Sequence, residues 1–264
     1  MNKILLIILF ILLLLVGKKR GIKTFITFII CFALIGLYII LMRFGFNAII
    51  LAFIICILAS MISLFFLNGL SPKTLAAFFG VLIVQVITFI LIAIISVRAN
   101  IGPFGEESLE TIAGYNLNIN YNMMDVVIGV YLVSIVGTVI DTSISIASAM
   151  NEVKENNPKI KEKELYKSGM NVGGDILSTT INTLFFALVS VFIGFFMWHR
   201  GMSFEQVINY KLFVYEVVEL LIAFIGSVII IPVSALISSK MLTNKKSDIL
   251  VDKIRTTIKS AFGD

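Results

Sequence analysis

The sequence predicts an all-α fold, a polytopic bundle of about seven transmembrane helices with its N-terminus outside and its C-terminus inside. Apolar residues make up 59% of the 264 residues, charged residues make up only 14%, and the mean hydropathy is +1.04. Soluble domains are typically about 45–50% apolar and about 25% charged. A soluble domain, a disordered chain, a nucleic-acid-binding protein and a secreted disulfide scaffold are therefore all disfavoured, and the lipid bilayer is the expected environment.

The apolar residues gather into runs that match membrane-spanning helices, each of which needs about 20 residues to cross the ~30 Å hydrocarbon layer. Ser71-Pro72 predicts the start of the fourth helix, because serine caps helices and proline suits the first turn. The first run is short and resembles a signal peptide, but the basic Lys18-Lys19-Arg20 that follows is not a cleavage site, so we expect a retained helix. The seven runs cover about 3–17, 24–42, 46–67, 74–97, 125–150, 174–198 and 212–239.

The distribution of lysine and arginine predicts which end of the bundle is cytoplasmic. With the N-terminus outside, 16 of the 21 basic residues fall on the cytoplasmic side and 5 on the outside, as the positive-inside rule requires. The frequent isoleucine, lysine and asparagine are typical of a low-GC bacterium. We therefore expect a multi-pass protein of the bacterial cytoplasmic membrane.

Polar content divides the chain into two halves. Gln85 is the only strongly polar residue within the first four helices, whereas the last three carry acids, amides and hydroxyls. Asn157-Pro158 predicts a helix start between two of these later helices. The expected segments are a four-helix hydrophobic half at 1–97, an external acidic and asparagine-rich loop at 98–124, a three-helix polar-striped half at 125–239 with a cytoplasmic hairpin at 151–173, and a cytoplasmic tail at 241–264.

One polar stripe is predicted along the helix at 125–150, where 3.6 residues per turn place five side chains on one face. Asp141 stands out within it, because a carboxylate inside a membrane costs about 2.5–3.5 kcal/mol on insertion scales and must face protein or water. The hydroxyls are equally compatible with simple helix packing. The stripe contains Ser134, Thr138, Asp141, Ser145 and Ser148.

Further polar residues extend this pattern to the last two helices. Asp175, Thr179 and Asn182 form a second stripe, and Glu216 and Glu219 share one face near the outer end of the last helix. Asp175 and Glu216 are equally compatible with simple interfacial positions.

Acids at several depths are the arrangement that a proton or cation pathway needs. In that interpretation Asp141 is the gating acid and Thr142 or Ser145 is its neighbour. Asp175 and Asn182 form the cytoplasmic entrance, and Glu216 with Glu219 forms the external one.

The sequence predicts no catalytic residues, no cofactor and no metal site. Cys31 and Cys56 lie inside apolar runs without zinc-ligand spacing, and His199 lies between Trp198 and Arg200 as in an interfacial belt. An intramembrane aspartyl protease is disfavoured because Val172-Gly173-Gly174-Asp175 lacks the first glycine of the Gly-x-Gly-Asp motif.

The stretch VGTVIDTSISIASAMNEV…KELYKSGMNVGGDILSTTINTLFFA, at 136–187, resembles the YibE/F family of bacterial membrane proteins. The pattern Glu219…Gly226-Ser227…Pro232…Ala235 is similar to the same family, and the length is similar to its YibF-type members. The resemblance implies a longer YibE-type membrane partner. The order of glycine, membrane acid, charged hairpin and polar helix is also similar to resistance-nodulation-division transporters and to SecD and SecF, which implies a proton-titrating role for Asp141.

These observations leave two functions open. The first is a permease-like or transport-associated subunit that uses intramembrane acids for proton or monovalent cation coupling. The second is an assembly or scaffold subunit of a complex with a YibE-type partner, without its own transport path. A homo-oligomer is the other expected assembly, because seven thin helices with acids on their outer faces need partner helices to enclose a pore.

Overall fold

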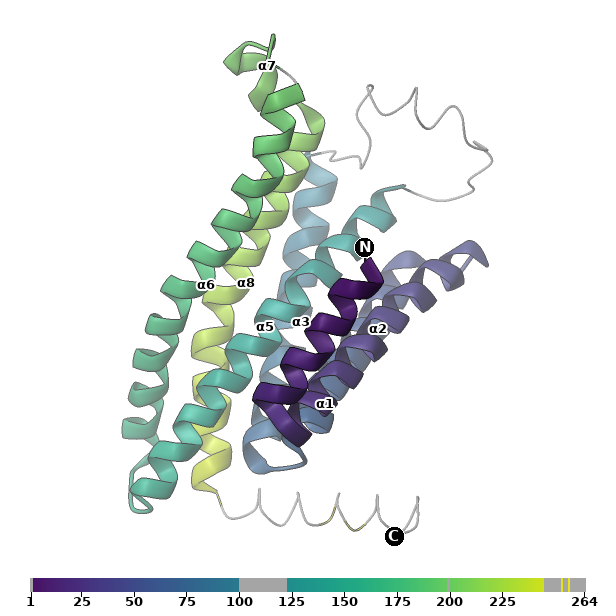
Figure 1. Cartoon of the computed structure of the whole chain (residues 1–264). Helices are drawn as coiled ribbons and strands as arrows, with labels where there is room; N and C mark the ends of the chain where they lie inside the picture. Colours follow the sequence, from purple (N-terminus) through teal and green to yellow (C-terminus); the bar gives the residue numbers. More distant parts are fainter. Residues whose placement is uncertain (1, 100–122, 199, 245–252, 254–255, 257–264) are drawn as a thin grey trace.

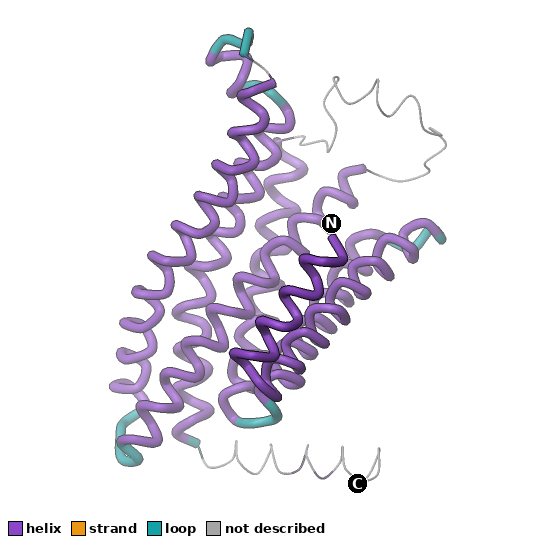
Figure 2. The backbone as a smooth tube through the Cα atoms, viewed as in Figure 1, coloured by secondary structure: helices purple, strands orange, loops and turns teal. Residues whose placement is uncertain are grey.

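The computed structural model describes residues 2–99, 123–198, 200–244, 253 and 256, and the regular structure within them is helical. This confirms the all-α prediction (Figures 1 and 2). The elements, in chain order, are α1 (Asn2–Arg43), α2 (Ala48–Met61), the π-helical turn η1 (Ile62–Phe66), α3 (Pro72–Ala99), α5 (Met123–Asn156), α6 (Glu162–Trp198), α7 (Phe204–Ile208) and α8 (Lys211–Thr243).

Six of these helices, within the described part of the chain, are long and apolar enough to cross a membrane. The first of them, α1, contains both of the first two predicted runs, because the chain reverses direction at Lys18 (φ 48°, ψ −126°). The two limbs pack tightly, with the Phe10 and Phe25 rings 4.7 Å apart. A Cβ at Gly21 would collide with the Leu13 carbonyl, so only glycine fits this crossing.

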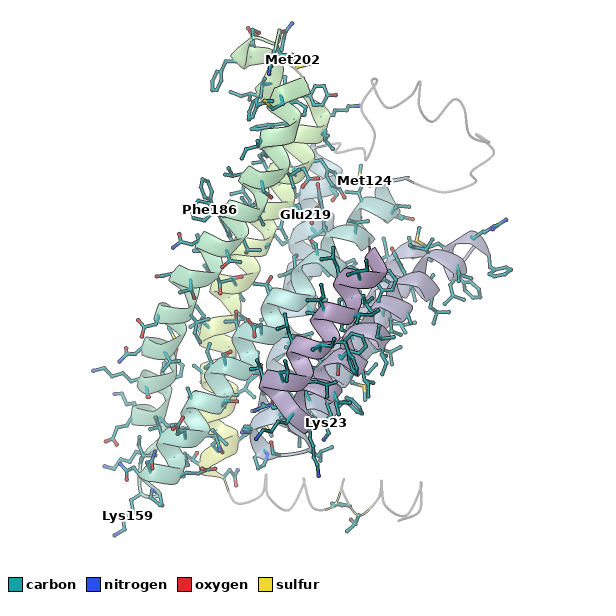
Figure 3. The ribbon with its side chains drawn as sticks, in the orientation of Figure 1. Lys23, Met124, Lys159, Phe186, Met202 and Glu219 are labelled. Atoms are coloured by element: carbon teal, nitrogen blue, oxygen red, sulfur yellow. The ribbon has the colours of Figure 1, made fainter. Side chains whose placement is uncertain are left out.

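Successive turns lie at alternating ends of the bundle, as the charge distribution predicts. Figure 3 labels Lys23 and Lys159 at one end and Met124 and Met202 at the other. The side of the membrane that each end faces remains a prediction. Residues 100–122 of the predicted external loop lie outside the described residues, and so does nearly all of the predicted tail beyond Asn244.

The predicted hairpin at 151–173 is almost entirely helical, because α5 and α6 extend past their apolar runs and only 157–161 is not helical. The helix start predicted at Pro158 is wrong. Pro158 lies in the turn, where its carbonyl accepts a hydrogen bond from Lys154 Nζ at 2.8 Å. Helix α6 begins at Glu162, where two acidic residues in the first turn suit the helix dipole. The start predicted at Ser71-Pro72 is confirmed.

Small residues bring α3, α5 and α8 close together in the core. The Ser143 hydroxyl donates to the Ala77 carbonyl at 3.0 Å, and the Ser234 hydroxyl donates to the Ser143 carbonyl at 3.2 Å. A Cβ at Gly80 would lie 3.2 Å from Ser143 Oγ, so glycine sets the spacing of the helices. Close backbone approach and hydroxyl-to-carbonyl bonds are how helices associate where the solvent is itself apolar.

Helix α6 packs on one side only. A Cβ at Gly173 would collide with Ile231 of α8, whereas a Cβ at the exposed Gly174 would meet nothing within 4 Å. Only 11% of the most apolar window of α6 is buried, against 44% for α8. The outward face of α6 is therefore open in the single chain.

We predict that Gly173→Ala destabilises the protein, because overpacking a tight contact costs typically about 1–3 kcal/mol. The measurement is the midpoint of thermal unfolding in detergent micelles. Gly174→Ala is the matched control and should be neutral or stabilising by up to about 1 kcal/mol, from helix propensity alone. Equal effects of the two substitutions would contradict the packing of α6 on α8.

Gln85, the strongly polar residue of the predicted hydrophobic half, is buried in the fold. Its side chain is only 5% exposed, and neither its amide nitrogen nor its amide oxygen has a hydrogen-bond partner among the described residues. It adjoins a hollow of about 10 Å³ between α3 and α5. An unsatisfied buried polar group costs about 1–3 kcal/mol.

We therefore predict that Gln85→Met raises the unfolding midpoint, because it keeps the volume and removes the unpaired amide. Ser60→Ala is the control: the Ser60 hydroxyl is equally buried but donates to the Cys56 carbonyl at 2.7 Å, so its loss should not stabilise the protein. A lower midpoint for Gln85→Met would show that the amide is satisfied by a bound group in the native protein.

Candidate functional site

The polar stripe of α5 contains some exposed residues and some half-buried ones. Ser134 and Asp141 are exposed and Thr138 is half-buried, on the face that looks away from α3. Ser145, further along the stripe, is half-buried. Thr142 is only 2% exposed and lies on the core side, so it does not share the surroundings of the Asp141 carboxylate.

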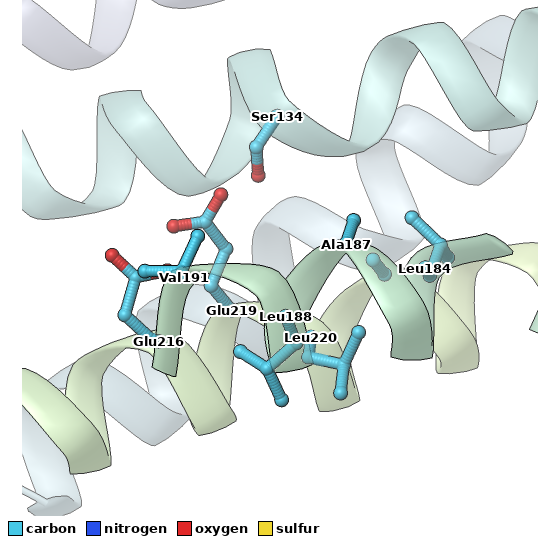
Figure 4. Close-up of a pocket in the computed structure, with 9 residues that line it drawn as sticks. Ser134, Leu184, Ala187, Leu188, Val191, Glu216, Glu219 and Leu220 are labelled. Atoms are coloured by element: carbon cyan, nitrogen blue, oxygen red, sulfur yellow. The ribbon is translucent and has the colours of Figure 1, made fainter. Parts of the chain in front are cut away.

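A first hollow of about 180 Å³ lies between α5, α6 and α8 and contains both predicted glutamates. Glu216 and Glu219 are half-buried there, and the Ser134 side chain points toward the Glu219 carboxylate (Figure 4). The Ser134 hydroxyl donates its hydrogen to the Tyr131 carbonyl at 3.0 Å. The apolar walls come from Leu184, Ala187, Leu188, Val191, Leu220 and Ala223. Glu219 thus lies beside one hydroxyl-bearing side chain and a second carboxylate inside a mostly apolar hollow.

Two tyrosines pack together next to these glutamates, Tyr131 fully buried and Tyr215 half-buried. The Tyr131 hydroxyl donates to the Tyr215 carbonyl at 3.2 Å, and the two ring centroids are 5.0 Å apart. This contact joins α5 to α8 next to Glu216 and Glu219.

A second hollow, of about 360 Å³, lies beside Asp141 between α5 and α6. Its lining is mostly hydroxyl-bearing: Thr138 from α5, and Thr179, Thr180 and Thr183 from α6. Carboxylate and hydroxyl oxygens are the hard ligands that suit a proton or an alkali cation rather than a transition metal. Asn182, predicted to accompany Asp141, is exposed on α6 and does not line this hollow.

A third hollow, of about 350 Å³, lies on the other side of Asp141, toward α1 and η1. Arg20 and Asn68 line it together with Asp141, and Arg20 Nη2 donates to Asn68 Oδ1 at 3.0 Å. Thr24 and Ser63 add two further hydroxyls. An arginine at the basic end of the bundle therefore shares a hollow with the intramembrane aspartate.

The three hollows adjoin one another. Leu184 lines the first and the second, and Gly137 and Asp141 line both the second and the third. We call the three hollows along the outer face of α5 together the polar furrow. Glu219 and Ser134 line its first hollow, Thr138 and Asp141 the second, and Asp141 and Arg20 the third, and Asp141 is exposed.

The remaining predicted site residues lie elsewhere. Asp175 and Asn182 are exposed on α6, outside the linings of the three hollows. Sequence reasoning missed Arg20, which it treated as a topology signal, and Thr183. The fold-back of α1 that brings Arg20 to Asp141 is not encoded in periodicity, although the glycines that flank Lys18-Lys19-Arg20 are a turn signal.

The described residues contain no group of three or more histidine, cysteine, aspartate or glutamate side chains placed to hold a metal ion. Cys56 is buried, with Sγ 3.7 Å from the Leu132 carbonyl oxygen, and Cys31 Sγ lies 3.9 Å from Ser63 Oγ. His199 lies outside the described residues. The chemistry available in the furrow is that of carboxylates, hydroxyls and one guanidinium.

Six long apolar helices within the described residues define a multi-pass helical membrane protein, and the polar furrow lies along the outer face of one of them, α5. A family model described as YibE/F-like protein matches residues 5–244, so the chain belongs to this family. The resemblance predicted from 136–187 is thereby confirmed. No curated protein and no solved structure matches the chain.

We predict that the polar furrow is hydrated. In a background carrying Cys31→Ser and Cys56→Ala, Thr138→Cys should react with a water-soluble maleimide, because a thiol needs water to ionise. Val228→Cys is the control, since Val228 is 48% exposed on α8 but belongs to none of the three hollows. Labelling of the two thiols at the same rate would contradict a hydrated furrow.

Proposed function

We propose that this YibE/F-like protein is a permease-like or transport-associated subunit of the bacterial cytoplasmic membrane, in which intramembrane acids couple to a proton or a monovalent cation. The observation that supports this is the polar furrow, in which Glu219 and Asp141 are joined through adjoining hollows. Ionisable residues at membrane depth are functional far more often than structural, because they are costly to keep.

The furrow suits stepwise transfer of a small positive species. Glu216 and Glu219 accept it near the outer end, and the hydroxyls of Ser134, Thr138 and Thr183 offer acceptors on the way to Asp141. Arg20 lies beyond Asp141 and is held by Asn68. A positive species bound at Asp141 weakens the electrostatic attraction between this carboxylate and Arg20. Binding at Asp141 therefore changes the electrostatic energy of the turn of α1 that carries Arg20. Asp175 and Asn182, the predicted cytoplasmic entrance, are exposed on α6 outside the three hollows and have no part in this route.

We propose no catalytic activity. An aspartyl protease needs two carboxylates that share one site. Asp175 is exposed and lines neither of the hollows beside Asp141. The arrangement therefore supports binding and transfer rather than hydrolysis.

One observation favours the alternative, a scaffold subunit. Asp141 and Asn182 are both exposed in the single chain, which suits polar residues that pack against a YibE-type partner. In this alternative the furrow is completed by the partner and conducts nothing by itself. Measuring ion transport by the purified protein in liposomes distinguishes the two functions.

We predict that Asp141→Asn lowers proton flux at least about tenfold in proteoliposomes, because a relay that loses its ionisable group loses the carrier site. The measurement uses an enclosed pH-sensitive dye and an imposed potassium diffusion potential. Glu152→Gln is the matched control, an exposed acid on the same helix outside the three hollows, and should leave the flux unchanged. A wild-type flux that Asp141→Asn leaves intact would overturn the proposed role, and correctly inserted wild-type protein that carries neither protons nor sodium would favour the scaffold.

A further inference from the structure

The third hollow contains two opposite charges that do not pair with each other. The Arg20 guanidinium and the Asp141 carboxylate both line it, yet no ion pair joins them among the described residues. Opposite charges that share one hollow attract each other, so an unpaired arrangement needs a reason. The hollow, about 350 Å³ in volume, thus has one cationic and one anionic lining group, and both charges are available to a ligand.

The cationic part of the lining suits an oxyanion. Arg20 Nη2 donates to Asn68 Oδ1 at 3.0 Å, and the guanidinium has no other hydrogen bond among the described residues. A guanidinium carries several N–H donors, so the others remain for a ligand. Because this bond uses the oxygen of Asn68, the NH₂ group of the same amide is a further donor. Arginine with neighbouring N–H groups is the arrangement that binds phosphate oxygens well.

The other polar groups of the lining accept hydrogen bonds. The Asp141 carboxylate has no hydrogen-bond or ion-pair partner among the described residues. The Thr24 hydroxyl gives its hydrogen to the Arg20 carbonyl at 3.0 Å, so only its oxygen remains for a ligand, as an acceptor. A primary ammonium group is positively charged and has N–H donors only, so it is complementary to this second set of groups.

The position of the hollow favours a lipid headgroup over a soluble ligand. Arg20 follows the reversal at Lys18, and Asn68 directly precedes the turn at 69–71, so both side chains lie where the helices end and lipid headgroups begin. Arg20 and Asp141 are exposed, so the hollow is reached from outside the bundle. Basic pockets between membrane helices at the cytoplasmic side are typical sites for lipid headgroups.

We propose that the third hollow binds the headgroup of phosphatidylethanolamine, with the phosphate on Arg20 and Asn68 and the ammonium on Asp141. In this hollow Asp141 repels an isolated anion and Arg20 repels an isolated cation, whereas a zwitterion is attracted by both. At the ~30 Å³ that a water molecule takes up in the liquid for its one non-hydrogen atom, phosphoethanolamine needs about 240 Å³ and fits the hollow. Leu67 and Ile144 supply apolar wall for the carbons next to the phosphate.

This lipid site goes beyond the proposed transport function and does not rest on it. The site uses the third hollow, whereas the proposed cation route reaches Asp141 through the second. The two share the Asp141 carboxylate, so a bound ammonium competes there with a mobile cation. Lipid binding is measured without any ion gradient, so its outcome is independent of the flux measured for Asp141→Asn.

The test is native mass spectrometry of the purified protein in mild detergent, titrated with phosphatidylethanolamine or with phosphatidylglycerol of the same acyl chains. The wild type should bind phosphatidylethanolamine at least about tenfold more tightly, because phosphatidylglycerol lacks the ammonium and its charge-assisted hydrogen bond. Asp141→Asn should abolish this preference, and Arg20→Gln should weaken the binding of both lipids at least about tenfold. Equal affinity of the wild type for the two lipids would overturn the proposal.

Two substitutions are matched controls for the change in charge. Lys19→Gln removes a positive charge next to Arg20, and Asp175→Asn removes an exposed acid of α6, and neither residue lines the third hollow. Both variants should keep the wild-type preference. A loss in Asp175→Asn as large as that in Asp141→Asn would show a general effect of charge and would overturn the site.

Thermal unfolding distinguishes a lipid from a soluble zwitterion and shows that the variants are folded. A ligand that binds only the native state raises the unfolding midpoint. Phosphatidylethanolamine should therefore raise the midpoint of the wild type more than phosphatidylglycerol does, and the two lipids should have equal effects on Asp141→Asn. Soluble phosphoethanolamine at the same concentration should leave the midpoint unchanged, because it lacks the acyl chains that hold the headgroup at the hollow. An equal rise with soluble phosphoethanolamine would assign the hollow to a soluble zwitterion and overturn the lipid site.

Discussion

Hydrocarbon offers no hydrogen-bond partners, and this constraint governs where each polar side chain of the protein lies. In the core the constraint is met locally: Ser143, Ser234 and Thr88 give their hydrogens to backbone carbonyls of the same or a neighbouring helix. A carboxylate cannot be satisfied in that way, because it has nothing to donate. The acids of the membrane helices therefore lie on the outer sides of α5, α6 and α8, whereas the Gln85 amide is buried in the core without a partner among the described residues.

The tight core and the open furrow are two consequences of one packing pattern. Gly80, Gly173 and Gly226 each sit where a Cβ would press on a neighbouring helix, so α3, α5, α6 and α8 approach closely along those lines. On the opposite side of α5, Ser134, Thr138 and Asp141 face α6, α8 and α1 across hollows instead of close contacts. The aspartate is held at membrane depth by a rigid helix while its surroundings remain accessible, which is what reversible binding of a small cation requires.

Asp141 joins the two inferences about function, because it lines two hollows at once. In one hollow the threonines of α6 surround the route proposed for a small cation. In the other, Arg20 completes the site proposed for a phospholipid headgroup. An ammonium group bound at Asp141 would occupy the carboxylate that the cation needs, so the lipid composition of the membrane would set how often Asp141 is free.

The sequence by itself determined the all-α membrane class, the helices α3 and α8 to within a few residues, and the family, because hydropathy and 3.6-residue periodicity are local properties. It predicted the apolar parts of α5 and α6 but not their extension into the hairpin between them. It also placed Ser134, Thr138 and Asp141 on one face of one helix. Only the tertiary structure decided what that face meets: the reversal at Lys18 that brings Arg20 into one hollow with Asp141, the position of Ser134 opposite Glu219, and the separation of Asp141 from Asn182. These three features depend on which helices lie side by side and on how each helix is rotated about its axis. Contacts of small residues between segments far apart in the chain, such as Gly173 against Ile231, set both the neighbours and the rotation.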